Sequence, residues 1–102
     1  SSKLDWLTSY SNPSKIILFG SAAYNEMTEA SDLDLIVIYE NEVDLKKIQK
    51  NLYLHRPKDD WPHDIFFYSK ESFEISLKKG GGICWLSEKE GKVIFSRNEE
   101  RE

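Results

Sequence analysis

The chain has 102 residues, with 14 basic and 18 acidic side chains and a formal net charge of −4 at pH 7. Its apolar content of 39% is enough for one modest core, so we expect a single domain over residues 1–102. The acidic balance argues against extended nucleic-acid binding, which needs a basic surface. The longest apolar run, Leu35 to Tyr39, is far too short to span a bilayer.

The single cysteine of the chain fits a reducing compartment. The single cysteine, Cys84, excludes an intrachain disulfide framework and a cysteine-based zinc site. We expect Cys84 to act as a small, buried or half-buried apolar side chain. No signal peptide is visible, so we expect a cytoplasmic protein that does not contact a membrane.

Apolar periodicity and turn residues divide the chain into alternating helices and strands. Short apolar runs bounded by Pro or Gly are typical of buried strands, and apolar residues three or four apart are typical of helices. In the first half of the chain we expect a helix over 2–10, a strand over 15–19, a helix over 21–27, a strand over 33–39 and a helix that is capped by Asn41 and runs to about Leu54. In the second half we expect a strand over 64–68, a helix over 69–79, a helix over 83–90, a strand over 93–95 and a frayed tail over 97–102. The helix over 69–79 starts at a capping Ser69 and ends at Gly80.

This order predicts an α/β fold of the mixed α+β kind, with a small mixed sheet of about four strands covered by helices. The helix between the second and third strands suits a right-handed parallel crossover. The inner stripe of that helix would begin with Val43 or Leu45, continue with Ile48 and Leu52, and end with Leu54 or His55. A compact segment joins the first and second strands, which could therefore pair parallel or antiparallel.

Two acidic residues, Asp32 and Asp34, enter the second strand. Residues i and i+2 of a strand point to the same face, so the two carboxylates repel each other unless a cation lies beside them. Carboxylate oxygens are the ligands that Mg²⁺ prefers. Aspartates that only cap the turn before a strand produce the same pattern, so this pair alone does not predict a metal site.

A third aspartate, Asp64, enters the third strand. If the second and third strands are parallel neighbours, Asp64 lies beside Asp32 and Asp34. Three carboxylates at one end of a sheet are destabilising without a metal. A solvated Asp at a strand start is the alternative for Asp64 taken by itself.

The first strand ends in Gly20-Ser21 and leads into a helix-compatible segment. The free N–H groups of a helix N-terminus favour phosphate, and glycine lets the backbone approach it closely. An ordinary helix cap would look the same. For this turn to meet the carboxylates, the first strand must end where the second begins, which predicts that the two strands are antiparallel.

Together these residues resemble a known signature. Gly20-Ser21, ten intervening residues and then Asp32-Leu33-Asp34 resemble the GSx10DxD motif of the DNA polymerase beta-like nucleotidyltransferase superfamily, and Asp64 resembles its third carboxylate. Chain length and element order are similar to those of its smallest branch, the minimal nucleotidyltransferases (MNT). The resemblance is close over residues 15–69 and looser over 70–95.

The resemblance implies a nucleotidyltransferase-like fold and a transferase. Gly20 and Ser21 would hold the triphosphate of a nucleotide, with ATP as the expected donor. Asp32 and Asp34 would bind two Mg²⁺ ions, which Mn²⁺ can replace. Asp64 would bind the catalytic metal and activate an acceptor hydroxyl, and pyrophosphate would be released. Many members carry an Arg shortly after Gly-Ser, where this chain has Ala22-Ala23-Tyr24.

Three other functions remain open at this stage. MNT proteins often act as antitoxins of a HEPN-type ribonuclease, so the resemblance implies either nucleotidyl transfer to such a partner or neutralisation by contact alone. A dimerising scaffold with vestigial carboxylates is a second alternative. A nuclease that uses the same metals is the third, although the Gly-Ser turn favours a phosphate tail over a polymer backbone. An open site without its own acceptor domain would be completed by a partner or by a homodimer.

Overall fold

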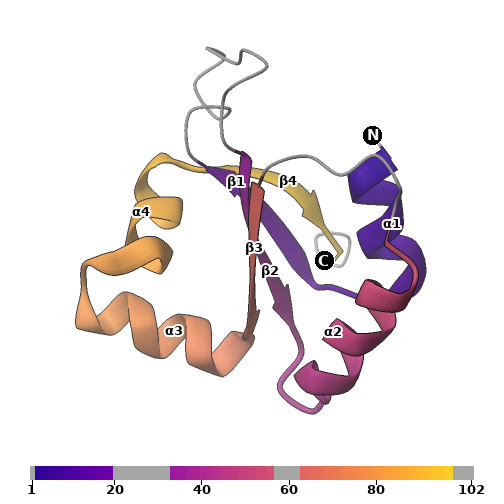
Figure 1. The fold of residues 1–102 in the computed structure, drawn as a ribbon. Helices are drawn as coiled ribbons and strands as arrows, with labels where there is room; N and C mark the ends of the chain where they lie inside the picture. Colours follow the sequence, from indigo (N-terminus) through magenta and orange to yellow (C-terminus); the bar gives the residue numbers. More distant parts are fainter. Residues whose placement is uncertain (1, 20–32, 57–62, 98–102) are drawn as a thin grey trace.

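The structure is a computed structural model that describes residues 2–19, 33–56 and 63–97. Within these ranges the helices and strands are, in chain order, α1 (Ser2–Tyr10), β1 (Lys15–Phe19), β2 (Leu33–Tyr39), α2 (Leu45–Leu54), β3 (His63–Ser69), α3 (Lys70–Lys79), α4 (Gly82–Glu90) and β4 (Lys92–Ser96) (Figure 1). The helix predicted over 21–27 lies outside the described residues. No helix in the described ranges is long and apolar enough to cross a membrane.

The strands form one mixed sheet in the order β3-β2-β1-β4. β1 pairs antiparallel with both β2 and β4, whereas β2 and β3 are parallel. The predicted mixed four-stranded sheet is therefore confirmed. The parallel crossover through α2 and the antiparallel pairing of the first two strands are confirmed as well.

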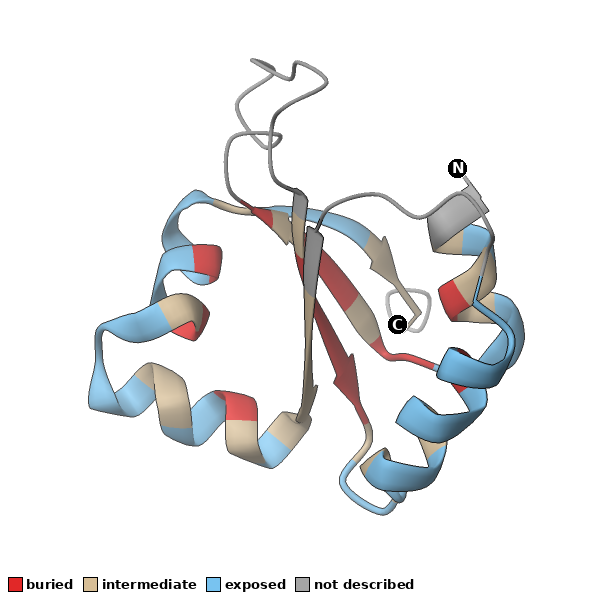
Figure 2. Ribbon diagram, viewed as in Figure 1, coloured by how far each residue is buried: buried red, intermediate tan, exposed pale blue. Residues whose placement is uncertain are grey.

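Helices cover both faces of the sheet, with α1 and α2 on one face and α3 and α4 on the other (Figure 1). Successive strand residues point to opposite faces, so each central strand contributes to two cores. The core beneath α1 and α2 contains Leu7, Ile16, Leu35, Val37, Tyr39 and Leu52. The core beneath α3 and α4 contains Ile17, Phe19, Ile36, Ile38, Phe73 and Cys84. Burial is concentrated in the two central strands (Figure 2), and the expected burial of Cys84 is confirmed.

The predicted cap of α2 was wrong. The helix begins at Leu45, and the Asp44 side chain accepts hydrogen bonds from the backbone N–H groups of Lys46 and Lys47 at 3.1 and 3.3 Å. A carboxylate at this position also interacts favourably with the helix dipole. The Asn41 side chain instead accepts the backbone N–H of Glu71 at 2.8 Å, in the first turn of α3.

The inner stripe of α2 ends earlier than expected. Leu52 is buried, with 1% exposure, whereas Leu54 is 67% exposed. His55 is also exposed, and its ring stacks on Tyr10 with the centroids 4.2 Å apart. The indole N–H of Trp6 donates to the Leu52 carbonyl at 3.0 Å and fixes α1 against α2.

The second helical layer begins and ends where the sequence predicts. Ser69 caps α3 through a capping box with Ser72. Gly80, Gly81 and Gly82 all have φ between +75° and +79°, a conformation that disfavours side chains, and this stops α3 before α4 begins. Arg97, the first residue of the predicted tail, donates its backbone N–H to the Ser14 carbonyl at 2.9 Å.

Candidate active site

The candidate site lies where β1 ends and β2 begins. Phe19, the last residue of β1, pairs with Asp34, the second residue of β2. The chain continues from Phe19 into Gly20, so this pairing brings the start of the Gly-Ser motif to the end of the sheet that carries Asp34. Gly20, Ser21 and Asp32 themselves lie outside the described residues.

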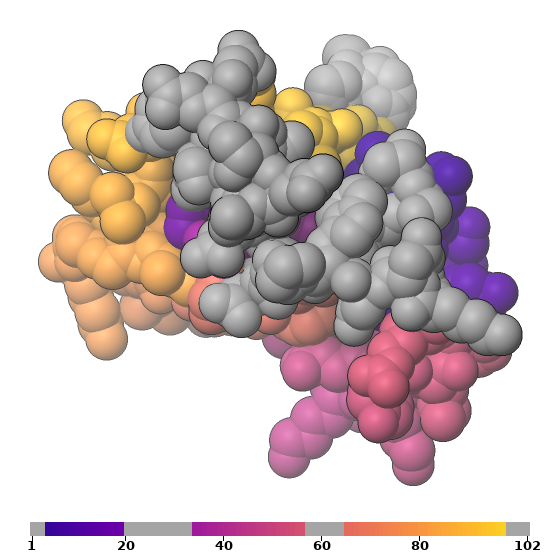
Figure 3. All heavy atoms as spheres, turned by 45° about the horizontal axis from the view of Figure 1, so that its top comes forward, coloured from indigo at the N-terminus to yellow at the C-terminus, as the bar shows by residue number. Residues whose placement is uncertain are grey.

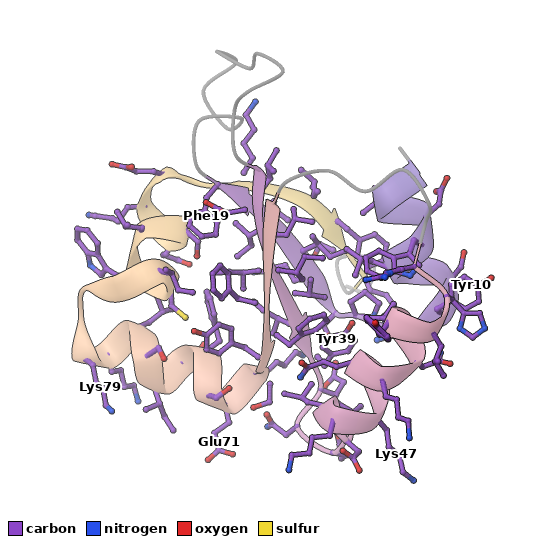
Figure 4. All side chains as sticks on the ribbon, in the orientation of Figure 1. Tyr10, Phe19, Tyr39, Lys47, Glu71 and Lys79 are labelled. Atoms are coloured by element: carbon purple, nitrogen blue, oxygen red, sulfur yellow. The ribbon has the colours of Figure 1, made fainter. Side chains whose placement is uncertain are left out.

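Asp34 belongs to the face of the sheet that α3 and α4 cover. It alternates along β2 with Leu35 and has the same parity as Ile36 and Ile38, which are core residues of that face. Its partner Phe19 is buried in the same core, and Figure 4 shows Phe19 on the α3 and α4 side of the sheet. Asp34 is half-buried, so solvent still reaches this edge of the core.

Asp64 is the partner of Asp34 in the parallel pair of β2 and β3. Each is the second residue of its strand, and Figure 1 shows the starts of these strands side by side. Neighbouring strands lie about 4.8 Å apart, so the two backbones are close at this position. The structure describes the backbone of Asp64 but not its side chain. The strand register therefore places the backbones of Asp34 and Asp64 side by side, as the sequence predicts.

The residue types at this end of the sheet suit a hard divalent cation. Asp34 and Asp64 offer only carboxylate oxygens, and Mg²⁺ and Mn²⁺ bind such ligands in preference to nitrogen or sulfur. Like charges at partner positions of a sheet are destabilising, and a cation between them removes that penalty. Among the side chains that the structure describes, no group of three His, Cys, Asp or Glu residues gathers to hold a metal. The three metal ligands predicted from the sequence include Asp32 and Asp64, whose side chains are not among those that the structure describes.

A separate polar cluster lies at the opposite end of β2. The Ser14 hydroxyl donates to Glu40 Oε2 at 2.8 Å, and Lys70 Nζ lies 3.1 Å from the same oxygen. The Ser14 hydrogen bond, followed by Lys70, holds the pKa of Glu40 below its ordinary value of 4.5. Sequence reasoning missed this cluster, because its members are far apart in the chain and share no motif.

A cavity of about 470 Å³ lies beside this cluster, between α3, α4 and the sheet. Its lining includes Lys15 at the start of β1, Ile38 near the end of β2 and Ser96 at the end of β4. It is therefore at the other end of the strands from Asp34.

The sequence matches the family described as polymerase beta, nucleotidyltransferase over residues 4–100. The chain belongs to this family. Membership confirms the resemblance to the DNA polymerase beta-like superfamily and supports nucleotidyl transfer as the general class of activity. The narrower resemblance to the MNT branch stays a prediction.

The fold is similar to that of a known structure. The crystal structure of a candidate nucleotidyltransferase from Sulfolobus solfataricus matches with a TM-score of 0.55 and 14% sequence identity, over 95% of this chain and 76% of that one. At this identity the likeness shows a shared fold, which confirms the expected nucleotidyltransferase-like architecture. The comparison with curated proteins finds no match.

Proposed function

We propose that the protein is a Mg²⁺-dependent nucleotidyltransferase. It would transfer a nucleoside monophosphate from a nucleoside triphosphate, with ATP as the first donor to test, to a hydroxyl acceptor that a partner protein can supply. The observation that carries this proposal is the pairing of Asp34 with Asp64 at the end of the sheet where β1 stops. Family membership supports the general reaction.

The metal ligands in this proposal are Asp32, Asp34 and Asp64, which would hold two Mg²⁺ ions or Mn²⁺ in their place. Their all-oxygen donor set fits these cations. When bound, such ions neutralise phosphate charge and stabilise the entering and leaving oxygens of an in-line displacement.

The protein's own groups would bind the nucleotide and move one proton. Backbone N–H groups at Gly20 and Ser21 would hold the triphosphate. The Asp64 carboxylate would accept the proton of the acceptor hydroxyl. The hydroxyl oxygen then forms a bond to the α-phosphorus, the bond from that phosphorus to the α–β bridging oxygen breaks, and pyrophosphate leaves with the bonding electrons.

Calorimetric titration with ATP tests this function without knowledge of the acceptor. We expect ATP to bind in the presence of Mg²⁺ and to bind much more weakly after chelation. Asp34→Asn should abolish the Mg²⁺-dependent part. The matched control is Glu42→Gln, which removes an exposed carboxylate beyond the opposite end of β2. Absence of Mg²⁺-dependent binding in the unchanged protein would contradict the proposal.

A second candidate function is a binding module that neutralises a HEPN-type partner by contact. Exposed apolar side chains on α4 and the edge strand β4 favour it: Trp85, Leu86, Val93 and Ile94 are all between 38% and 54% exposed. Neutralisation that survives Asp34→Asn would support the contact mechanism. Neutralisation that is lost in Asp34→Asn, but kept in Glu42→Gln, would support catalysis.

A further inference from the structure

One face of α2 combines lysines with exposed apolar side chains. Lys46, Lys50 and Leu54 follow one another at intervals of four residues, which places them along one side of the helix. Lys47 and Tyr53 flank this row. We call these five residues the α2 outer face. Leu54 is 67% and Tyr53 62% exposed, and most of α2 is exposed in Figure 2.

The α2 outer face is a basic region on an acidic protein. Residues 45–56 contain four of the 14 basic residues of the chain and none of its 18 acidic residues. The remainder therefore holds ten basic against 18 acidic residues. Asp44, directly before the helix, directs its carboxylate to the backbone N–H groups of Lys46 and Lys47. Within the described parts of the chain, the only ion pair found joins Lys70 to Glu40, away from α2.

Aromatic and apolar side chains gather around the C-terminal end of the same helix. The Arg56 guanidinium lies 4.5 Å from the centroid of the Tyr53 ring. Tyr10 is 42% exposed and stacks on His55. Leu54 is largely exposed and lies one helical turn after Lys50. Exposed apolar groups bordered by charged residues are typical of interaction sites.

From this arrangement we propose that the α2 outer face is the docking surface for an acidic segment of a partner protein that also carries apolar side chains. Carboxylates of the segment pair with Lys46, Lys47 and Lys50, and its apolar residues cover Tyr53 and Leu54. The charge asymmetry favours an acidic polypeptide over nucleic acid, because the strongly acidic remainder of the molecule repels a long phosphate backbone. Figure 3 shows α2 projecting from the rest of the molecule, so a helix or extended segment can reach it.

Docking at α2 would also bring the partner toward the candidate active site. Because β2 and β3 are parallel, α2 returns the chain to the end of the sheet where β3 begins with His63 and Asp64. A partner held on this face can therefore present a hydroxyl near Asp64. This last step rests on the proposed function, whereas docking itself does not.

Binding of a defined probe separates docking from catalysis. The probe is a fluorescein-labelled helical peptide with glutamates on one face and leucines on the other, followed by fluorescence anisotropy. The comparison probes are the same peptide with glutamines in place of the glutamates and an oligouridylate RNA of similar charge. The variants are Lys46→Glu/Lys50→Glu and Leu54→Ser. The control is Lys78→Glu/Lys79→Glu, which reverses two exposed lysines of α3.

We expect the acidic peptide to bind more tightly than either comparison probe, and its affinity to fall as salt is raised. Lys46→Glu/Lys50→Glu should weaken binding at least about tenfold, and Leu54→Ser severalfold without changing the salt dependence. The control should leave binding unchanged. All substituted residues are exposed, and circular dichroism and melting temperature check that the variants fold.

Four results would overturn the docking proposal. These are failure of the acidic peptide to bind, tighter binding of the RNA, an equal loss of binding in the α3 control, and concentration-dependent self-association that Lys46→Glu/Lys50→Glu abolishes. The last would assign the face to a second copy of the chain. None of these results depends on ATP or Mg²⁺, so loss of the docking proposal leaves the proposed function standing, and the reverse holds as well.

Discussion

Asp34 of β2 and Asp64 of β3 are partner residues in a parallel strand pair, each one residue inside its strand. Two acidic residues at such positions lower stability unless something compensates their charge. Phe19, on the other side of Asp34, ends the strand that leads into Gly20. The topology thus brings the end of β1 and the backbones of Asp34 and Asp64 together at one end of the sheet.

Removal of one of these carboxylates should impair nucleotidyl transfer more than folding. We expect Asp34→Asn to lower the rate of pyrophosphate release by roughly 10²–10³-fold, because a charge that helps to organise the transition state is lost. A coupled pyrophosphate assay with the cognate acceptor measures this. Glu42→Gln should retain nearly the full rate, and a similar loss in both variants would argue against a specific role for Asp34.

Divalent cations should stabilise the folded protein. A ligand that binds only the native state at about 100 times its Kd adds about 2.7 kcal/mol to the free energy of unfolding. Thermal melts with increasing Mg²⁺ should therefore show a rising Tm. Asp34→Asn should reduce this Mg²⁺-dependent rise in Tm, because it removes one of the proposed ligands. An equal rise in Tm for both proteins would indicate that the ion binds elsewhere.

Leu52 and Leu54 offer a matched test of the packing of α2. Both are leucines of the same helix, but Leu52 is 1% exposed and Leu54 is 67% exposed. Leu52→Ala should lower the free energy of unfolding by about 2–5 kcal/mol, because it leaves a cavity beneath the helix. Leu54→Ala should change it by less than about 0.5 kcal/mol. Urea denaturation measures both, and comparable losses would mean that α2 packs with a different face.

The hydrogen bond from Ser14 should make stability depend on pH through Glu40. This bond is the largest cause of the lowered Glu40 pKa, and Lys70 adds to it. A pKa that is lower in the folded state than in the unfolded state stabilises the fold above the ordinary value of 4.5. That contribution is lost as the pH falls through the lower folded value.

Ser14→Ala tests this linkage. We expect the variant to be less stable than the unchanged protein at neutral pH, and the difference to shrink as the pH falls below 4.5. Urea denaturation across this range gives the free energies of unfolding. A difference of the same size at neutral and acidic pH would mean that Ser14 acts through packing alone.

Much of the fold was predictable because the strands are short apolar runs with clear breaks. The run from Lys15 to Phe19 ends at Gly20, and the parallel crossover after Tyr39 follows from the intervening helix. The parallel crossover was enough to predict that Asp34 and Asp64 would become neighbours. The relation depends on chain order and strand direction, which local sequence patterns encode.

The errors concern choices among similar residues and contacts between distant ones. Asn41 and Asp44 are both good caps, but Asp44 caps α2 whereas Asn41 accepts a hydrogen bond from Glu71 in α3. The hydrogen bond between Ser14 and Glu40 joins residues 26 positions apart, and no periodic pattern reports it. Such details depend on how the layers pack together.

A crystal structure with Mn²⁺ and a nonhydrolysable ATP analogue tests the central claim most directly. The account predicts anomalous density bonded to carboxylate oxygens of both Asp34 and Asp64 at about 2.1–2.2 Å, with the triphosphate at Gly20-Ser21. Carboxyl groups of Asp34 and Asp64 that lie more than about 8 Å apart, with no metal between them, would contradict it.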